Sequence, residues 1–261
     1  MTDPLVEVDG LSHAYDGLGG ARRQALDGVS LRIDRGEFVG IVGPSGSGKT
    51  TLLRCIAGLM RPTGGVVRVA GKTVRDVPDE LAIVFQDYGR SLFPWLNVRA
   101  NVEMPLRRLR LTPDERDRRI ASSLGEVGLA GAAASFPWEL SGGMQQRVAI
   151  ARAIAYRPQI LLMDEPFGSV DAQTRADLQD LALEVWQAHA STVLFVTHDI
   201  DESVYLADRV IVLSQPPGRI VGAVAVDLPR PRDQIETRAS RRFAELRAEV
   251  ARLVRRPEPD R

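Results

Sequence analysis

The sequence predicts an α/β fold built on a parallel β-sheet with crossover helices. Three short, predominantly apolar runs support this prediction, because strands buried on both faces of a parallel sheet have this length and composition. They span residues 38–42, 160–163 and 192–196, and helical stretches separate them along the chain. With 261 residues, the chain is long enough to bury the core of one large α/β domain or two small ones.

Further strand-like segments surround these three runs. Turn residues at 62–65 and 70–71 separate the early segments, which predicts hairpins near the start of the chain. The additional strands are expected at residues 5–8, 29–33, 66–69, 81–85, 210–213 and 220–226.

Two regions are predicted to be helical. Within residues 97–157, Thr112 and Glu115 match a capping box, with proline at the first helical position between them. Within residues 239–255, apolar side chains recur at spacings of three and four, with arginine and glutamate between them. The second pattern predicts an amphipathic helix that lies on the domain. Its apolar residues are Phe243, Leu246, Val250 and Leu253.

Charge and hydropathy restrict the possible partners. The 34 basic and 34 acidic residues balance, so no overall field attracts nucleic acid, and we expect no nucleic-acid partner. The start of the chain has neither a basic nor an apolar segment, so we expect no secretory signal. The longest apolar runs fall far short of the ~20 residues that span a bilayer. Cys55 is the only cysteine and is expected to be a small core residue.

Residues 43–50 match the phosphate-binding loop G-x-x-x-x-G-K-[ST], between a predicted strand and a predicted helix. Its glycines allow backbone N–H groups to converge on phosphate oxygens, and the helix dipole favours the same anion. Lys49 is expected to reach the β- and γ-phosphates and the Thr50 hydroxyl to bind Mg²⁺. The predicted nucleotide-contacting residues here are Gly43, Pro44, Ser45, Gly46, Ser47, Gly48, Lys49, Thr50 and Thr51.

The predicted strand at 160–163 leads into two adjacent carboxylates. Asp164 is expected to hold Mg²⁺, through water, and Glu165 to act as general base toward the attacking water. A solvated strand end is the alternative interpretation. The phosphate loop elsewhere in the chain favours the catalytic one.

Residues 140–147 read Leu-Ser-Gly-Gly-Met-Gln-Gln-Arg and open a predicted helical run. Taken alone, a serine followed by glycines is an ordinary helix cap, and the same geometry can bind an anion. Together with the phosphate loop and the Asp-Glu strand end, however, this segment resembles the signature of the ATP-binding-cassette (ABC) ATPases.

This resemblance covers nearly the whole chain and implies the ABC ATPase fold. That fold has a RecA-like P-loop NTPase core, an N-terminal antiparallel β subdomain and an inserted α-helical subdomain. We expect the ATPase domain at residues 1–232, with the core at about 1–88 and 158–226 and the helical subdomain at about 89–157. A C-terminal helical extension is expected at 233–261.

The resemblance also implies ATP as the nucleotide and a second copy of the chain as a partner. Ser141, Gly142 and Gly143 would close over the γ-phosphate held by that second copy, so that two ATPs are enclosed in a head-to-tail dimer. Asp171 matches the D-loop aspartate at the dimer seam. Trp138 stands where the family frequently has histidine, a departure that removes no catalytic group.

Three further residues match single positions of the family. Gln86 matches the Q-loop glutamine, which senses Mg²⁺ and water, and is a candidate metal ligand with Thr50 and Asp164. His198 matches the switch histidine that hydrogen-bonds the γ-phosphate, although a lone histidine after a strand is more often structural. Tyr15 stands where an aromatic ring stacks on adenine, with a core tyrosine as the alternative.

The resemblance further implies an importer. One cassette without a fused membrane span is typical of bacterial import systems, which have separate permease chains and an external solute-binding protein. Phe93-Pro94-Trp95 and the segment 226–233 are similar to the nitrate/sulfonate/taurine-type ATPases. We therefore expect a peripheral subunit at the cytoplasmic face of the membrane.

Residues 87–95 are unusually aromatic for this chain, with Tyr88, Phe93 and Trp95 close together. In ABC transporters this region receives the coupling helix of the permease, and aromatic anchors suit such an interface. The alternative is that Phe93 and Trp95 pack inside the helical subdomain.

Other functions within the family remain open. An export ATPase for a lipid or drug would have the same chemistry and another partner. A nucleic-acid- or ribosome-associated ATPase would be expected to carry tandem cassettes, coiled coils or a basic face. A non-catalytic regulator or scaffold is disfavoured by the intact Asp164, Glu165 and His198.

Overall fold

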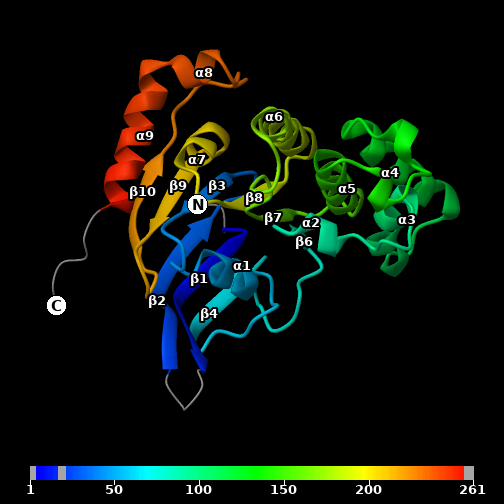
Figure 1. Ribbon diagram of the computed structural model, residues 1–261. Helices are drawn as coiled ribbons and strands as arrows, with labels where there is room; N and C mark the ends of the chain where they lie inside the picture. The colour runs from blue at the N-terminus through cyan, green and yellow to red at the C-terminus, as the bar shows by residue number, and fades with distance from the viewer. Residues whose placement is uncertain (1–3, 17–21, 256–261) are drawn as a thin grey trace. The chain divides into compact units, whose positions relative to one another are not determined.

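The computed structural model describes residues 4–16 and 22–255, and the chain forms two compact units (Figure 1). The first unit comprises residues 1–81 and 191–261, and the second comprises residues 82–190. Each unit is described separately below.

The first unit begins with an antiparallel sheet of four strands in the order β2-β1-β4-β5. Its strands are β1 (Val6–Asp16), β2 (Arg22–Ile33), β4 (Gly64–Val69) and β5 (Lys72–Thr73). On β1, Val6 pairs with Ile33 of β2 on one side and with Val69 of β4 on the other. This arrangement confirms antiparallel strands near the start of the chain. Both β1 and β2 are longer than predicted, because their hydrogen-bond ladders continue through polar residues.

The first unit also contains four strands of a second, mixed sheet, in the order β10-β9-β3-β8. These strands are β3 (Phe38–Val42), β8 (Thr192–Val196), β9 (Arg209–Leu213) and β10 (Ile220–Ala225). Strand β3 runs parallel to both β8 and β9, whereas β10 is antiparallel to β9. Every residue of β3 and β8 is buried, as predicted for strands covered on both faces.

Helices α1 (Lys49–Ile56), α7 (Ile200–Leu206), α8 (Glu236–Ala239) and α9 (Arg241–Val254) complete the first unit. The amphipathic C-terminal helix is confirmed as α9, which contacts α7, β9 and β10 (Figure 1). Its residues Phe243, Leu246 and Val250 are buried. Near its end, a Cβ added to Gly222 of β10 would lie 2.9 Å from Leu253 Cδ1, which shows how closely the helix approaches the strand.

Two arginines of the segment 229–232 cap the end of α7. The guanidinium of Arg232 donates to the carbonyl oxygens of Tyr205 (2.6 Å) and Ala207 (2.9 Å). Arg230 donates to the Leu206 carbonyl at 3.0 Å. The last carbonyls of a helix have no partner within it, so these bonds satisfy them. Burial of Arg232 lowers its pKa to about 10.

The second unit is mainly helical. Strands β6 (Leu81–Val84) and β7 (Ile160–Asp164) are its two strands among the described residues. The α-helices are α2 (Tyr88–Ser91), α3 (Val98–Glu103), α4 (Pro113–Glu126), α5 (Gly142–Ala155) and α6 (Ala172–His189). Short 3-10 helices η2 (Met104–Arg108), η3 (Ala130–Ala132) and η4 (Pro137–Glu139) connect them.

Helix α5 is the centre of the second unit, since it contacts α2, α3, α4 and α6. The predicted cap of α4 is confirmed, because the Thr112 hydroxyl accepts a hydrogen bond from the Glu115 N–H at 3.2 Å. Over the described part of the chain, no helix combines the length and apolarity needed to cross a membrane.

Candidate functional site

The phosphate loop (residues 43–50) connects β3 to α1 in the first unit. Gly48, the N-cap of α1, has φ 87°, a left-handed conformation that favours glycine. The loop closes around Lys49, whose Nζ donates to the carbonyl oxygens of Gly43 (2.9 Å) and Pro44 (3.0 Å). The ammonium group is therefore held inside the loop, where a bound phosphate would lie beside it.

Two glycines of the phosphate loop leave no room for a side chain. A Cβ at Gly43 would lie 2.9 Å from the Leu213 carbonyl oxygen. A Cβ at Gly48 would lie 2.8 Å from the Ala25 carbonyl oxygen and 2.6 Å from Leu26 Cδ2. The backbone of the loop thus packs directly on β2 and β9. Such a preformed backbone cradle fits a nucleotide phosphate.

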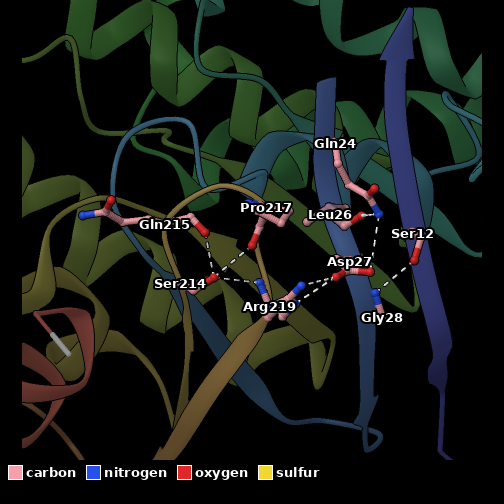
Figure 2. A network of polar contacts seen from close by, with 9 residues as sticks. All are labelled: Ser12, Gln24, Leu26, Asp27, Gly28, Ser214, Gln215, Pro217 and Arg219. Carbon is pink, nitrogen blue, oxygen red and sulfur yellow. Dashed lines mark hydrogen bonds and ion pairs between the residues drawn. The ribbon is translucent and has the colours of Figure 1, made fainter. Parts of the chain in front are cut away.

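A polar network supports the phosphate loop from the β2 side, and Figure 2 shows its members. Arg219 forms an ion pair with Asp27 of β2. The Arg219 N–H donates to the Ser214 hydroxyl at 3.0 Å, and that hydroxyl donates to the Pro217 carbonyl at 3.0 Å. These bonds fix the conformation of the loop 214–219 against β2.

Gly218, within that loop, is a residue that sequence reasoning missed. Its N–H donates to Ala25 O at 2.8 Å, and its carbonyl accepts from the Asp27 N–H at 3.0 Å. A Cβ at this position would lie 1.9 Å from the Ser47 carbonyl oxygen. The phosphate loop therefore rests on Gly218. No local motif marks it, because it lies about 170 residues from the loop in sequence.

Tyr15 lies on β1 beside the start of α1. Its hydroxyl shares a hydrogen bond of 2.9 Å with Thr51 Oγ1, and its ring packs edge-on against His13 at 4.8 Å. The side chain is 39% exposed, so the alternative of a core tyrosine is wrong. A ring that is tethered yet exposed can stack on a base.

His198 follows β8 in the first unit and is exposed. The residues around it are fixed by hydrogen bonds. The Thr197 hydroxyl donates to Glu202 Oε2 at 2.7 Å, and Asp199 accepts from the Asp201 and Glu202 N–H groups at 2.8 and 3.1 Å as the N-cap of α7. The turn that presents the histidine is thus a rigid strand-to-helix connection.

In the second unit, β7 ends at the predicted carboxylate pair. Asp164 is buried, and Glu165 has φ 43°. A left-handed backbone costs a residue with a side chain of order 1–3 kcal/mol, and such strain clusters at functional sites. Gln86 Nε2 donates to Glu165 Oε2 at 3.4 Å, so two of the predicted catalytic residues lie together.

The signature turn (residues 140–143) leads into α5. The Ser141 hydroxyl accepts from the Met144 N–H at 3.3 Å, which confirms the serine as a helix cap. A Cβ at Gly143 would lie 2.4 Å from Thr174 Cγ2 of α6. Asp171 in turn binds Thr174, accepting from its N–H at 3.0 Å and its hydroxyl at 2.6 Å.

These contacts connect two predicted motifs inside one unit. The hydrogen bonds from Thr174 lower the pKa of Asp171 below its usual value, because they stabilise the carboxylate. Asp171 caps α6 and fixes Thr174, and Thr174 packs against Gly143. A displacement of the D-loop would therefore reach the signature turn through one threonine methyl group.

The predicted magnesium ligands offer oxygen atoms, the donors that Mg²⁺ prefers. They are the Thr50 hydroxyl in the first unit and the Asp164 carboxylate and Gln86 amide in the second. Among residues 4–16 and 22–255, no group of three or more histidine, cysteine, aspartate or glutamate side chains could hold a metal ion.

The aromatic segment after Gln86 includes a strongly exposed tryptophan. Trp95 is 69% exposed and packs on Phe93 with ring centroids 5.5 Å apart, so it is not a core residue. The Tyr88 side chain lies outside the described residues.

Asn101, which sequence reasoning missed, fixes the loop that carries Trp95. This fully buried side chain accepts from the Phe93 N–H at 2.8 Å. Its amide donates to the carbonyl oxygens of Phe93 (3.1 Å) and Leu96 (2.9 Å). The sequence gives no recognisable signal for this role, because an asparagine on a helix is usually exposed. Only the burial of Asn101 and its hydrogen bonds to the loop show that it fixes the loop.

Cys55 lies buried on α1. Burial disfavours the thiolate and raises the pKa of Cys55 to about 11. Its expected role as a small core residue is confirmed.

Comparisons with known proteins identify the family of this chain. The ABC transporter family matches residues 26–168. An uncharacterized ABC transporter ATP-binding protein of Methanocaldococcus jannaschii, MJ0412, is 46% identical over 250 residues, which cover 96% of this chain and 91% of that protein. The nitrate import ATP-binding protein NrtC of Synechocystis is 42% identical over 250 residues, 95% of this chain but only 37% of that longer protein.

Among solved structures, the chain is similar to the dimeric post-hydrolysis state of the ATP-binding cassette MJ0796 bound to ADP and Pi. The TM-score is 0.74 at 35% sequence identity, and the match covers 85% of this chain and 98% of the other. This similarity confirms the fold expected from the sequence.

Proposed function

Because this chain belongs to the ABC transporter family of ATP-binding proteins, we propose that it is the ATP-hydrolysing subunit of a bacterial importer for a small solute. It is an ABC ATPase. The observation that carries the proposal is the exposed Trp95 on a loop locked by Asn101, in a chain that also has the complete set of ATPase motifs. A catalytic subunit that serves a permease needs both features.

The proposed hydrolysis follows from the residue chemistry. Lys49 and the N–H groups of the phosphate loop stabilise charge on the transferred phosphoryl group. Thr50, Asp164 and Gln86 are the residues that would hold Mg²⁺, which would supply further charge neutralisation. Glu165 accepts a proton from the attacking water, and Gln86 orients Glu165 through their hydrogen bond. His198 donates to the γ-phosphate.

Two copies are proposed to cooperate in each cycle. ABC cassettes form dimers, as the MJ0796 structure does. In this chain, Ser141, Gly142 and Gly143 of one copy would cap the ATP held by the phosphate loop of the other, with Asp171 at the seam and Tyr15 on the adenine. Closure of the dimer would then move the permease segments docked on it.

The proposed permease contact is the aromatic segment 87–95. Aromatic side chains that are exposed and held rigid make effective interface anchors, because little conformational entropy is lost when a partner covers them. The permease and an extracytoplasmic solute-binding protein would be separate chains, and this subunit would lie at the cytoplasmic face of the membrane.

The solute class is proposed from similarity within the family. Nitrate, sulfonate and taurine are the candidates that the segments 93–95 and 226–233 suggest, and nitrate agrees with the name of the relative NrtC, a nitrate import ATP-binding protein. Export of a lipid or drug is the competing outcome. Purification of the tagged chain from membranes of its own host would decide, because an importer brings down a permease that cooperates with a solute-binding protein.

The test of the catalytic proposal is Glu165→Gln. This variant keeps the size of the side chain and loses the base, so we expect hydrolysis to fall about a hundredfold or more. Binding of MgATP should persist, and sedimentation should show a stable dimer that the wild type forms only transiently. Turnover at the wild-type rate would refute the role of Glu165.

A further inference from the structure

Trp138 is exposed beside the signature turn without a role in the chemistry above. It lies in η4, three residues before Ser141, and 65% of its surface is accessible. Single exposed aliphatic residues are common, but a tryptophan rarely leaves so large an apolar surface in water. Together with its place next to a helix N-terminus, this suggests a surface that a partner covers.

The structure holds this indole in one position. Trp138 stacks on Phe136, with ring centroids 4.6 Å apart and ring planes at 11°. The Phe136 N–H donates to the Glu139 carboxylate at 2.7 Å, which closes the 3-10 turn that carries the ring. The side chain is therefore preorganised, so a partner that covers it has little rotamer entropy to remove.

The same turn is bound to the start of α5. Gln145 Nε2 donates to the carbonyl oxygens of Pro137 (3.0 Å) and Leu140 (3.2 Å), on either side of Trp138. Trp138 and Ser141 thus belong to one rigid element. Whatever surface approaches the N-terminus of α5 also approaches the indole.

We propose that Trp138 is a contact residue of the ATP-bound dimer, where its indole packs on the second copy. This inference rests on the sandwich dimer of the proposed function. A second copy is the occupant because the signature turn, rigidly joined to Trp138, faces the second copy in that dimer. The other strongly exposed tryptophan, Trp95, lies on the separate loop assigned to the permease.

Tryptophan fluorescence tests the proposal directly. The chain has three tryptophans, Trp95, Trp138 and Trp186. In the Glu165→Gln background, W95F and W186F leave Trp138 as the single reporter. Addition of MgATP should shift its emission to shorter wavelength and lower acrylamide quenching by about half or more, as expected for a residue buried in an interface core.

The matched control keeps Trp95 as the single reporter, with W138F and W186F in the same background. Its emission should not change with MgATP, because no permease is present. Sedimentation of both proteins establishes the dimer independently of fluorescence.

Dimer affinity provides a second readout. Each dimer contains two Trp138 contacts, and loss of a buried indole costs about tenfold per site, so Trp138→Ala should weaken dimerisation about a hundredfold. Trp138→Phe should retain most of the affinity, and Trp95→Ala should retain all of it. Thermal melting of each variant checks that the fold is intact.

The outcomes are distinct. A dimer with Trp138 still open to acrylamide overturns the inference and leaves the proposed function standing. Shielding of Trp138 only when the permease is present also overturns it, and assigns the residue to the transporter interface. Absence of any MgATP-dependent dimer refutes the sandwich itself, and the inference with it.

Discussion

Two helix N-termini of this protein, those of α1 and α5, are proposed phosphate contacts, and they are capped in different ways. Helix α1 begins at Lys49 after Gly48, an N-cap with no side chain that could satisfy the first N–H groups. Helix α5 begins at Gly142 after Ser141, whose hydroxyl already accepts from the Met144 N–H. The first end thus has no side-chain cap, whereas at the second end a side chain satisfies one of the first N–H groups.

The atoms packed against the glycines at these two helix ends also differ. In the phosphate loop, Gly43 and Gly48 meet backbone carbonyls, which cannot move without disturbing β2 and β9. In the signature turn, Gly143 meets the Thr174 methyl group, which belongs to a side chain of α6 and not to its backbone. We infer that the phosphate loop is the fixed binding surface, whereas the signature turn can adjust to the state of its surroundings.

The largest expected effect comes from removal of the phosphate-loop cation. Lys49→Ala should reduce ATP hydrolysis by at least about a hundredfold, since it deletes a charge aimed at the transferred phosphoryl group. The matched control is Lys72→Ala, because Lys72 is the only other lysine and is exposed on β5. Phosphate-release assays on both variants would measure the difference. Equal rates would show that the phosphate loop is not the catalytic cradle.

A side chain added to the signature turn should slow ATP hydrolysis and leave nucleotide binding unchanged. Gly143→Ala pushes Thr174, so we expect ATP hydrolysis to fall about ten- to a hundredfold through misplacement of the turn. Nucleotide affinity of the single chain, measured by calorimetry, should not change.

A second substitution separates packing from chemistry at this position. Thr174→Ser removes the obstructing methyl group and keeps the hydroxyl that binds Asp171. The double variant should therefore recover much of the rate lost in Gly143→Ala. No recovery would mean that Thr174 does not couple the D-loop to the signature turn.

A side chain added at Gly218, beneath the phosphate loop, should lower both the nucleotide affinity and the stability of the fold. Gly218→Ala forces the Ser47 backbone aside, at an expected loss of about 2–3 kcal/mol in the free energy of unfolding and about tenfold in ATP affinity. Gly125→Ala is the control, because nothing lies within 4 Å of the Cβ it would add. Denaturant unfolding measures the stability of both variants, and calorimetry measures their ATP affinity. A Gly218→Ala variant with the stability and ATP affinity of the wild type would contradict the supporting role of the loop 214–219.

The smallest expected effect is a low reactivity of the Cys55 thiol toward alkylating reagents. Because burial on α1 raises its pKa to about 11, the thiol stays protonated at pH 8, and alkylation should proceed far more slowly than in the unfolded chain. MgATP should slow it further by stabilising α1. Mass spectrometry of iodoacetamide-treated protein measures both rates, and fast labelling of the native chain would mean that α1 opens readily.

The candidate catalytic residues could be proposed from the sequence because each belongs to a local motif. The phosphate loop, the Asp164–Glu165 pair and Ser141 are recognisable within a few neighbouring residues, and buried strands such as Phe38–Val42 are evident from apolar runs. The left-handed backbone of Glu165 could not be predicted, since it is imposed by the surrounding fold.

The supporting residues could not be predicted because their roles depend on distant partners. Gly218 is important only through Ser47, Asn101 through the Phe93 loop, and Thr174 through Gly143. The lengths of β1 and β2 were underestimated for the same reason, since their polar residues are held by strand pairing rather than by apolar alternation.

The central claim is that each ATP is bound by the phosphate loop of one copy and capped by the signature turn of another. In a Cys55→Ala, Glu165→Gln background, one chain would carry Ser45→Cys and a second chain Gly142→Cys, both at exposed positions. Mixed with MgATP under mild oxidation, the two chains should form a disulfide between copies that neither chain forms efficiently alone. Cross-linking that is equally weak with and without MgATP, or no stronger in the mixture than in each chain alone, would contradict the account.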